Sequence, residues 1–168
     1  MSRGFRQKTL EEISSESLFK FFRKNKATIL CWHPPDGKAY FTPLYHFPEI
    51  NTEGERTGRR NHIDLIFQIK EYLVLLEVKG EEKDFSIDIN KLRNISKQYS
   101  IKELIDVLII QGAVFDNPPT ELVLALSSYD VISDSQVPSD MALFKATDNQ
   151  NVEALNSLAM KVINKLKK

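Results

Sequence analysis

The chain has 168 residues, a length that suits one domain with its own hydrophobic core. Apolar residues make up 42% of it and charged residues 27%, which is the balance of a folded globular protein and argues against extended disorder. The 23 basic and 23 acidic side chains cancel, so a polybasic nucleic-acid binder and an acidic tail are excluded, whereas a local basic patch is not.

The first half of the chain predicts one helix followed by strands. Residues 9–25 carry an apolar stripe at helical spacing, and a threonine and a glutamate three residues apart form a capping box at its start. A strand is expected at 27–33, and the Pro-Pro-Asp-Gly turn after it predicts a returning strand near 38–42. The polar stretch 47–61, interrupted by proline and glycine, predicts an exposed loop.

The second half predicts more strands and two further helices. In chain order these are strands at 62–69 and 72–79, a helix at 86–103, strands at 106–110 and 121–127, and an amphipathic helix at 151–168. Helices and strands mixed in this order predict an α/β or α+β fold, in which a central mixed sheet is flanked by helices. We expect a single domain, 1–168, that ends with the helix at about 151–168.

Cysteine content and apolar runs indicate the compartment. Cys31 is the single cysteine, so neither an intramolecular disulfide nor a zinc site built from cysteines can form. The first residues lack the apolar core of a signal peptide. The apolar runs at 73–76 and 107–110 fall far short of the roughly 20 residues that a membrane span needs. We therefore expect no membrane segment and a cytoplasmic location.

A hairpin formed by the two central strands would bring charged side chains together. With its turn at 70–71, the register places Asp64 opposite Glu77. Directly opposed side chains share one face with Cβ atoms about 5 Å apart, and the strand period of two adds Lys79 to that face. The rest of the hairpin is apolar on both faces, which is typical of strands in the middle of a sheet.

Two carboxylates and one ammonium at the end of an apolar hairpin indicate a metal site. Close carboxylates repel each other unless a cation lies between them. Oxygen ligands suit Mg²⁺ or Mn²⁺, and a lysine beside such an ion can orient a water molecule or stabilise negative charge. A surface ion cluster is the alternative, but the apolar flanks favour the metal site. His62 falls opposite Lys79 in the same register and is more typical of a structural histidine than of a catalytic one.

The pattern Asp64, twelve intervening residues, then Glu77-Val78-Lys79 resembles the metal site of the PD-(D/E)xK nucleases. This superfamily includes restriction endonucleases, junction resolvases and many repair nucleases. The proline that the family name places before the aspartate is Ile63 here. The core of the superfamily is a helix, three antiparallel strands, a helix and a strand, and the predicted elements of 9–127 follow that order. The resemblance therefore implies a restriction endonuclease-like core.

The resemblance also implies an activity and its residues. It implies a nuclease that depends on Mg²⁺ or Mn²⁺ and hydrolyses phosphodiester bonds, as an endonuclease acting on DNA. Asp64 and Glu77 would be the catalytic carboxylates that bind the metal, the carbonyl of Val78 a further metal ligand, and Lys79 the catalytic lysine.

A glutamate of the first helix often joins the metal site in this superfamily. Glu16 is the best match by position, and we expect it to be a fourth catalytic residue. Glu11 and Glu12 remain alternatives, although Glu12 is expected to be engaged in the capping box.

Basic residues near the expected site are candidates for binding nucleic acid. Arg59 and Arg60 precede Asp64 in the predicted loop and are expected to contact phosphates. In the nuclease interpretation Lys91, on the following helix, would reach toward the scissile phosphate. Because a small neutral domain binds DNA weakly, a homodimer or a partner subunit is expected. The alternative to an enzyme is a non-catalytic module that uses the same fold to bind nucleic acid or protein.

Overall fold

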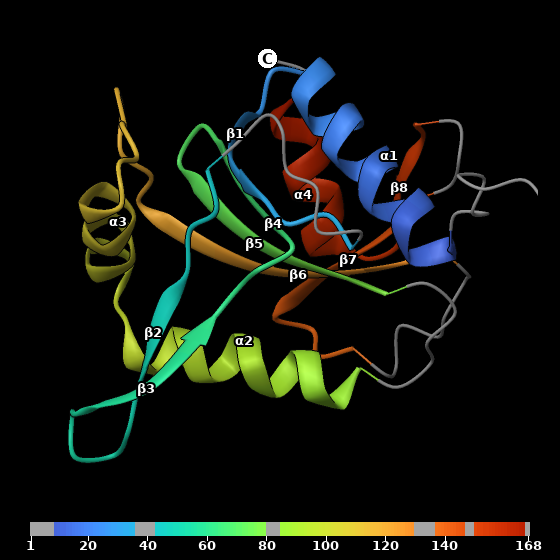
Figure 1. Ribbon diagram of the computed structural model, residues 1–168. Helices are drawn as coiled ribbons and strands as arrows, with labels where there is room; N and C mark the ends of the chain where they lie inside the picture. The colour runs from blue at the N-terminus through green and yellow to red at the C-terminus, as the bar shows by residue number, and fades with distance from the viewer. Residues whose placement is uncertain (1–8, 36–42, 80–84, 130–136, 147–149, 167–168) are drawn as a thin grey trace, which may run out of the picture.

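The computed structural model describes residues 9–35, 43–79, 85–129, 137–146 and 150–166, and its centre is a six-stranded mixed sheet (Figure 1). In spatial order the strands are β1 (Thr28–Trp32), β4 (Leu65–Ile69), β5 (Tyr72–Lys79), β6 (Glu121–Ser128), β7 (Met141–Ala146) and β8 (Val152–Ala154). The neighbours β1, β4 and β5 are antiparallel, β5, β6 and β7 are parallel, and β8 is antiparallel at the edge. The expected α/β or α+β class, with a central mixed sheet, is confirmed.

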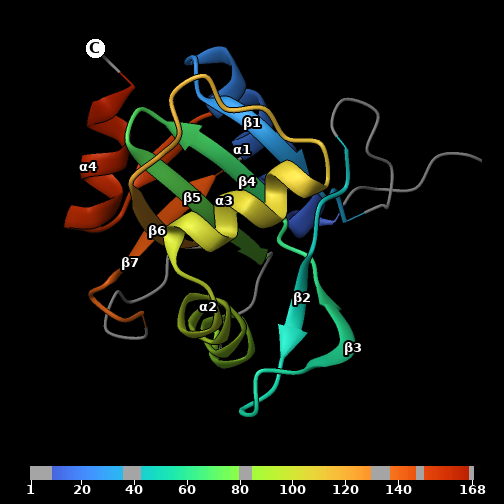
Figure 2. The same ribbon diagram turned by 90° about the vertical axis from the view of Figure 1, so that its left-hand side faces the viewer.

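Helices cover both faces of the sheet (Figures 1 and 2). The pair α1 (Leu10–Lys24) and α4 (Ser157–Lys165) lies on one face, and the pair α2 (Ser86–Gln98) and α3 (Ile101–Ile110) lies on the other. At the start of α1 the hydroxyl of Thr9 accepts a hydrogen bond from the Glu12 amide, so the predicted cap is present. None of these helices, in the part of the chain that the structure describes, is both long and apolar enough to cross a membrane.

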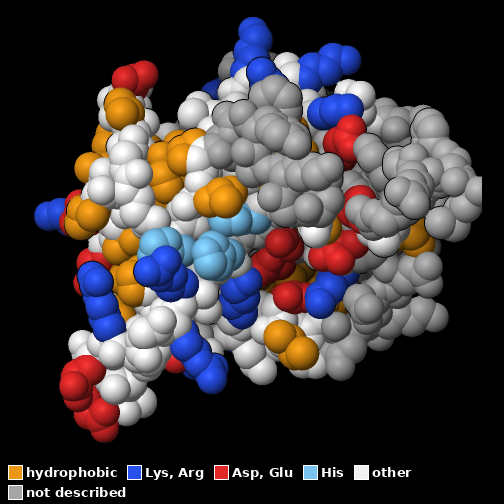
Figure 3. Space-filling model, in the orientation of Figure 1, with side chains coloured by type: hydrophobic (Ala, Val, Ile, Leu, Met, Phe, Trp, Pro, Cys, Tyr) orange, Lys and Arg blue, Asp and Glu red, His pale blue; other side chains and the backbone are white. Residues whose placement is uncertain are grey.

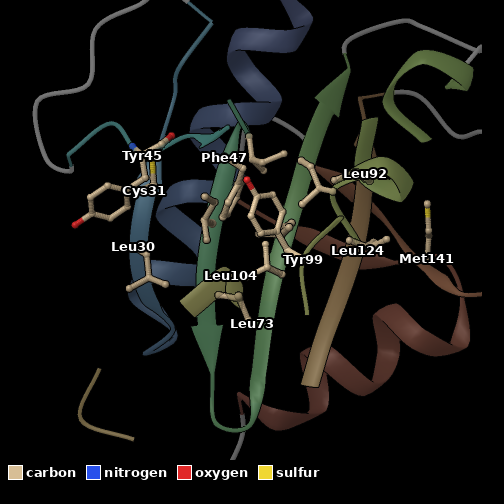
Figure 4. Close-up of a cluster of buried hydrophobic side chains, with 14 of the residues drawn as sticks. Leu30, Cys31, Tyr45, Phe47, Leu73, Leu92, Tyr99, Leu104, Leu124 and Met141 are labelled. Carbon is tan, nitrogen blue, oxygen red and sulfur yellow. Dashed lines mark hydrogen bonds between the residues drawn. The ribbon is translucent and has the colours of Figure 1, made fainter. Parts of the chain in front are cut away.

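Two buried hydrophobic clusters, one on each face, hold the layers together. In the first, the rings of Phe22 and Phe67 stack with centroids 4.2 Å apart and join α1 to β4. Figure 4 shows the second, which includes Tyr99 and Leu104 from the helical side and Leu73 of β5. Alternate residues of β5 enter the two clusters, so this strand is buried on both faces, as its apolar sequence predicts.

The β4–β5 hairpin has the predicted register. Leu65 pairs with Leu76 and Phe67 pairs with Val74. The chain reverses through Lys70, which takes the left-handed conformation with a φ of 52°. The residue before β4 and the last residues of β5 consequently meet at one edge of the sheet.

Residues 47–61 form a two-stranded ribbon, so the predicted loop is wrong. In it β2 (Phe47–Ile50) pairs antiparallel with β3 (Arg56–Asn61), and the ribbon extends away from the central sheet in Figures 1 and 2. The hydropathy pattern did not reveal these strands because β3 is exposed along almost its whole length. A strand without a buried face shows no apolar alternation.

The segment predicted as one helix and one strand forms two helices. The helix predicted at 86–103 ends at Gln98, and Ser100 starts α3 through a reciprocal capping box with Glu103. Residues 106–110, predicted as a strand, complete α3. A short apolar run does not distinguish a buried strand from a buried helix by periodicity alone, whereas the capping box favours the helix.

The C-terminal region is also more divided than predicted. Instead of one helix at 151–168, the chain forms the edge strand β8, and Asn156 then caps α4 by accepting from the Ala159 amide. Strand β7 was not predicted. The strand predicted near 38–42 lies outside the described residues.

Candidate metal centre

Asp64 and Glu77 meet at the edge of the sheet where β4 begins and β5 ends. The Val78 amide donates a hydrogen bond to Oδ2 of Asp64 at 2.7 Å. The Asp64 amide donates to Oε2 of Glu77 at 3.4 Å. Strand alternation places Glu77 on the same face as Leu75, which belongs to the cluster under α2 and α3. The predicted contact between the two acidic residues is therefore present, on the α2 side of the sheet.

The two carboxyl groups are poorly solvated, and burial raises the pKa of each. Glu77 is only 3% exposed. Burial, followed by the hydrogen bond and the charge of Asp64, raises the pKa of Glu77 to about 8. Burial also raises the pKa of Asp64, although hydrogen bonds from Glu77 and the Val78 amide oppose the rise. The pKa values of both carboxyl groups are therefore raised, and the Lys91 ammonium beside them opposes the rise.

Two lysines lie against the acidic cluster. Lys91 Nζ is 2.5 Å from Oε1 of Glu77 and also donates a hydrogen bond to the carbonyl of His62. Lys79 Nζ is 3.4 Å from Oδ2 of Asp88, a carboxylate of α2. In Figure 3 acidic side chains gather in the middle of the face, with histidines and with Lys and Arg side chains beside them. Lys79 and Lys91 thus both reach the site that the sequence predicted.

Asp88 belongs to this cluster, although no motif pointed to it. Burial, and then the charge of Glu77, raises the pKa of Asp88, whereas Lys79 opposes the rise. Asp88 lies three residues before Lys91 on α2, and residues three apart share a helix face. In the sequence, the spacing of three residues between Asp88 and Lys91 on a predicted helix was the signal that could have placed Asp88 near the site.

The choice of Glu16 as a catalytic residue stays a prediction, and Glu11, one of its alternatives, also acts on the site. Burial is the largest cause of the raised pKa of Asp64, and the charge of Glu11 adds to it. Glu16 forms an ion pair with Lys20, with Nζ 2.6 Å from Oε1. Five residues correspond to about 500° around a helix, so the side chains of Glu11 and Glu16 point about 140° apart. Position along the chain favoured Glu16, but it does not determine the helix face.

All three histidines of the chain lie together beside the acidic pair. The ring centroid of His62 is 4.9 Å from that of His33 and 5.9 Å from that of His46. His62 follows β3 and is not paired with Lys79 as predicted, because β4 begins only at Leu65. No sequence pattern predicts the histidine cluster, since its members come from the ends of three different strands.

The structure places Arg59 and Arg60 on different sides of the β2–β3 ribbon. They are adjacent residues of β3, and adjacent strand residues point to opposite faces. Arg60 is the one near the histidines: burial is the largest cause of the lowered pKa of His46, and the charge of Arg60 is the next. The expectation that both arginines contact phosphates stays a prediction.

The donor set fits one divalent cation held by few protein ligands. Mg²⁺ is commonly bound through one or two carboxylates and keeps several water molecules. Among the described atoms, Oε1 of Glu77 and Oδ2 of Asp88 are buried and accept no hydrogen bond of normal geometry, although each lies beside an ammonium. Within the described ranges no group of three or more His, Cys, Asp or Glu side chains forms a metal cage. Asp64 and Glu77 could hold such a cation together with water, and the Val78 carbonyl as a further ligand stays a prediction.

Comparison with known proteins does not assign the chain to a family. No protein-family model, no curated protein and no solved structure matches it. The chemistry of the acidic cluster is therefore the basis on which its function is inferred.

The raised pKa of Glu77 predicts an unusual pH dependence of stability in the absence of metal. The unfolded carboxyl loses its proton near pH 4.5, whereas the folded one keeps it up to about pH 8. The free energy of unfolding should therefore fall as the pH rises between these values, and this fall should be smaller in Glu77→Gln. Urea unfolding of both proteins in EDTA, at the low and the high end of this pH range, measures the change in the free energy of unfolding. Equal pH dependence in the two proteins would contradict a raised pKa at Glu77.

Proposed function

We propose that the chain is a divalent-metal-dependent nuclease of the PD-(D/E)xK type, which hydrolyses phosphodiester bonds in DNA as an endonuclease. The observation that carries the proposal is the contact of Asp64 with Glu77 at the edge of the sheet. Lys79 lies two residues after Glu77 on the same face, and Lys91 approaches from α2. Carboxylates whose pKa values are perturbed by burial and by specific charged neighbours cluster at functional sites.

The order of the elements supports the same proposal. The helix α1 is followed by the antiparallel strands β1, β4 and β5, then by helices and by the parallel strand β6. This is the order of helix, three antiparallel strands, helix and strand in the superfamily core. The β2–β3 ribbon is an insertion between the first and second of these strands. A restriction endonuclease-like core is therefore part of the proposal.

Each residue of the cluster has a role in such a reaction. Asp64 and Glu77, with the Val78 carbonyl, would hold Mg²⁺ or Mn²⁺. When bound, the ion lowers the pKa of a coordinated water molecule and neutralises charge on the phosphate. A protonated lysine can donate hydrogen bonds but cannot accept them. Lys79 is therefore suited to orient the attacking water and to stabilise negative charge on the phosphate. Asp88 holds the Lys79 ammonium at this place.

Lys91 and the surrounding charges would position the substrate. The Lys91 side chain is 28% exposed, and its ammonium forms an ion pair with Glu77. A phosphate that approaches the acidic pair would find this ammonium beside it. A cytoplasmic location, expected from the sequence, is also part of the proposal.

A cleavage assay tests the proposal. The full chain should nick supercoiled plasmid DNA in Mg²⁺ or Mn²⁺ and should lose this activity in EDTA. Activity that survives EDTA would contradict metal dependence. If DNA and RNA both stay intact while labelled oligonucleotides bind, the cluster serves a non-catalytic binding module and the nuclease proposal is wrong.

A further inference from the structure

One side of the β2–β3 ribbon joins the histidine cluster to the acidic pair. Phe47 pairs with Asn61, and Pro48 pairs with Arg60. Because opposed residues share a face and faces alternate, Arg60 and Pro48 lie on the side of the ribbon opposite to the buried Phe47. His46 and His62 are the residues next to the Phe47–Asn61 pair at the base of the ribbon. By the same alternation, their side chains lie on the side of Arg60 and Pro48.

This side leads directly to the site. The His62 ring packs against His33, whose backbone amide donates a hydrogen bond to the Asp64 carbonyl at 2.8 Å. The His62 carbonyl accepts a hydrogen bond from Lys91, the lysine that also contacts Glu77. The histidine cluster at the base of the ribbon therefore adjoins the carboxylates through His33 and Lys91.

Away from the histidines the ribbon carries charges of both signs. Oε1 of Glu49 accepts a hydrogen bond from the Thr57 hydroxyl at 3.1 Å. Glu53 and Glu55 lie in the exposed turn that connects the two strands, and Arg56 follows them. The charge of Arg60 reaches both His46 and His62, where it lowers their pKa values after burial, the largest cause. A polyanion that follows the histidines would therefore meet Arg60.

We propose that the side formed by His46, Pro48, Arg60 and His62, with His33 beside it, is a track for the sugar–phosphate backbone of a nucleic-acid strand. The track would lead that strand to the acidic pair, and in this respect it rests on the proposed nuclease function. The guanidinium of Arg60 can bind a phosphate through two parallel N–H donors. The imidazoles supply further N–H donors and flat faces along the strand. Arg59, on the other side of β3, lies off the track.

Arg60→Ala and Arg59→Ala form a matched pair that tests the track. The two variants lose the same charge at neighbouring, exposed positions of one strand. Fluorescence anisotropy in EDTA measures binding of a labelled oligonucleotide, as a single strand and as a duplex, to the full chain while no metal supports cleavage. Arg60→Ala should weaken binding about tenfold and lower the slope of log K against log[NaCl] by about one unit, because one phosphate contact is lost. Arg59→Ala should stay within about twofold of the parent.

The outcomes separate the track from the nuclease. Equal losses in the two variants, or a larger loss in Arg59→Ala, would overturn the track even if the parent cleaves DNA. A selective loss in Arg60→Ala supports the track even if the parent cleaves nothing, in which case only the nuclease proposal fails. A parent that binds neither oligonucleotide would overturn the track. Circular dichroism and thermal unfolding of both variants check that the ribbon substitutions leave the fold in place.

Discussion

Asp64→Asn should abolish metal binding and, with it, cleavage of DNA. A carboxylate bonded to a divalent ion at about 2.1 Å contributes about 4 kcal/mol even at the dielectric constant of water, and an amide restores only part of this. We therefore expect the affinity for Mn²⁺ to fall by about a hundredfold or more. The asparagine can still accept the hydrogen bond that the Val78 amide gives to Asp64, so the sheet edge should keep its structure. Calorimetric titration with Mn²⁺ and the plasmid assay measure the two effects.

Glu16→Gln is the control for this substitution. It also removes one negative charge from a carboxylate, but that carboxylate is paired with Lys20 on the surface of α1. Its Mn²⁺ affinity should remain within about twofold of that of the parent. If Glu16→Gln lowered the Mn²⁺ affinity as much as Asp64→Asn does, Glu16 would be a metal ligand. That result would contradict a metal site centred on Asp64 and Glu77.

Lys79→Ala should separate metal binding from turnover. Both carboxylates remain, and a neighbouring positive charge is removed, so the Mn²⁺ affinity should be retained or increase. The rate of cleavage should nevertheless fall by about a hundredfold or more, as the loss of a positioned electrostatic group does. Calorimetry and single-turnover cleavage of an oligonucleotide duplex measure the two quantities on the same preparations.

Lys145→Ala is the matched control for Lys79. In register, Lys79 pairs with Ser128 and Ser128 pairs with Lys145, so the two lysines lie at the same edge of the sheet, two strands apart. Two strand spacings amount to roughly 10 Å. Removing Lys145 should change the cleavage rate by less than about threefold. If Lys79→Ala cleaves as fast as the parent, or if both variants lose activity equally, the catalytic role of Lys79 is wrong.

Local sequence patterns predicted the central hairpin correctly because its two strands are joined by a tight turn. The turn at Lys70 determines the register, and burial on both faces makes the two strands uniformly apolar. The same apolar character misled the assignment of 106–110, where the run belongs to a helix whose capping box begins at Ser100. The exposed strand β3 has no buried face, so its pairing with β2 left no apolar pattern to detect.

The candidate site was predictable to the extent that it depends on this hairpin. Register and strand alternation are enough to bring Asp64 and Glu77 together and to add Lys79. The choice between Glu11 and Glu16, by contrast, depends on how α1 is rotated against the sheet, which is a property of the packed core. The histidine cluster depends on three strand ends that meet only in the folded chain.

The central claim is that Asp64 and Glu77 jointly bind a divalent cation. Anomalous X-ray diffraction from crystals of the full chain soaked in Mn²⁺ tests this most directly, because it locates the ion without relying on activity. The account predicts an anomalous peak within coordination distance of Asp64, Glu77 and the Val78 carbonyl in the parent protein, and no peak there in Asp64→Asn. Crystals of the parent that show no peak between the two carboxylates, or a peak that persists unchanged in Asp64→Asn, would contradict it.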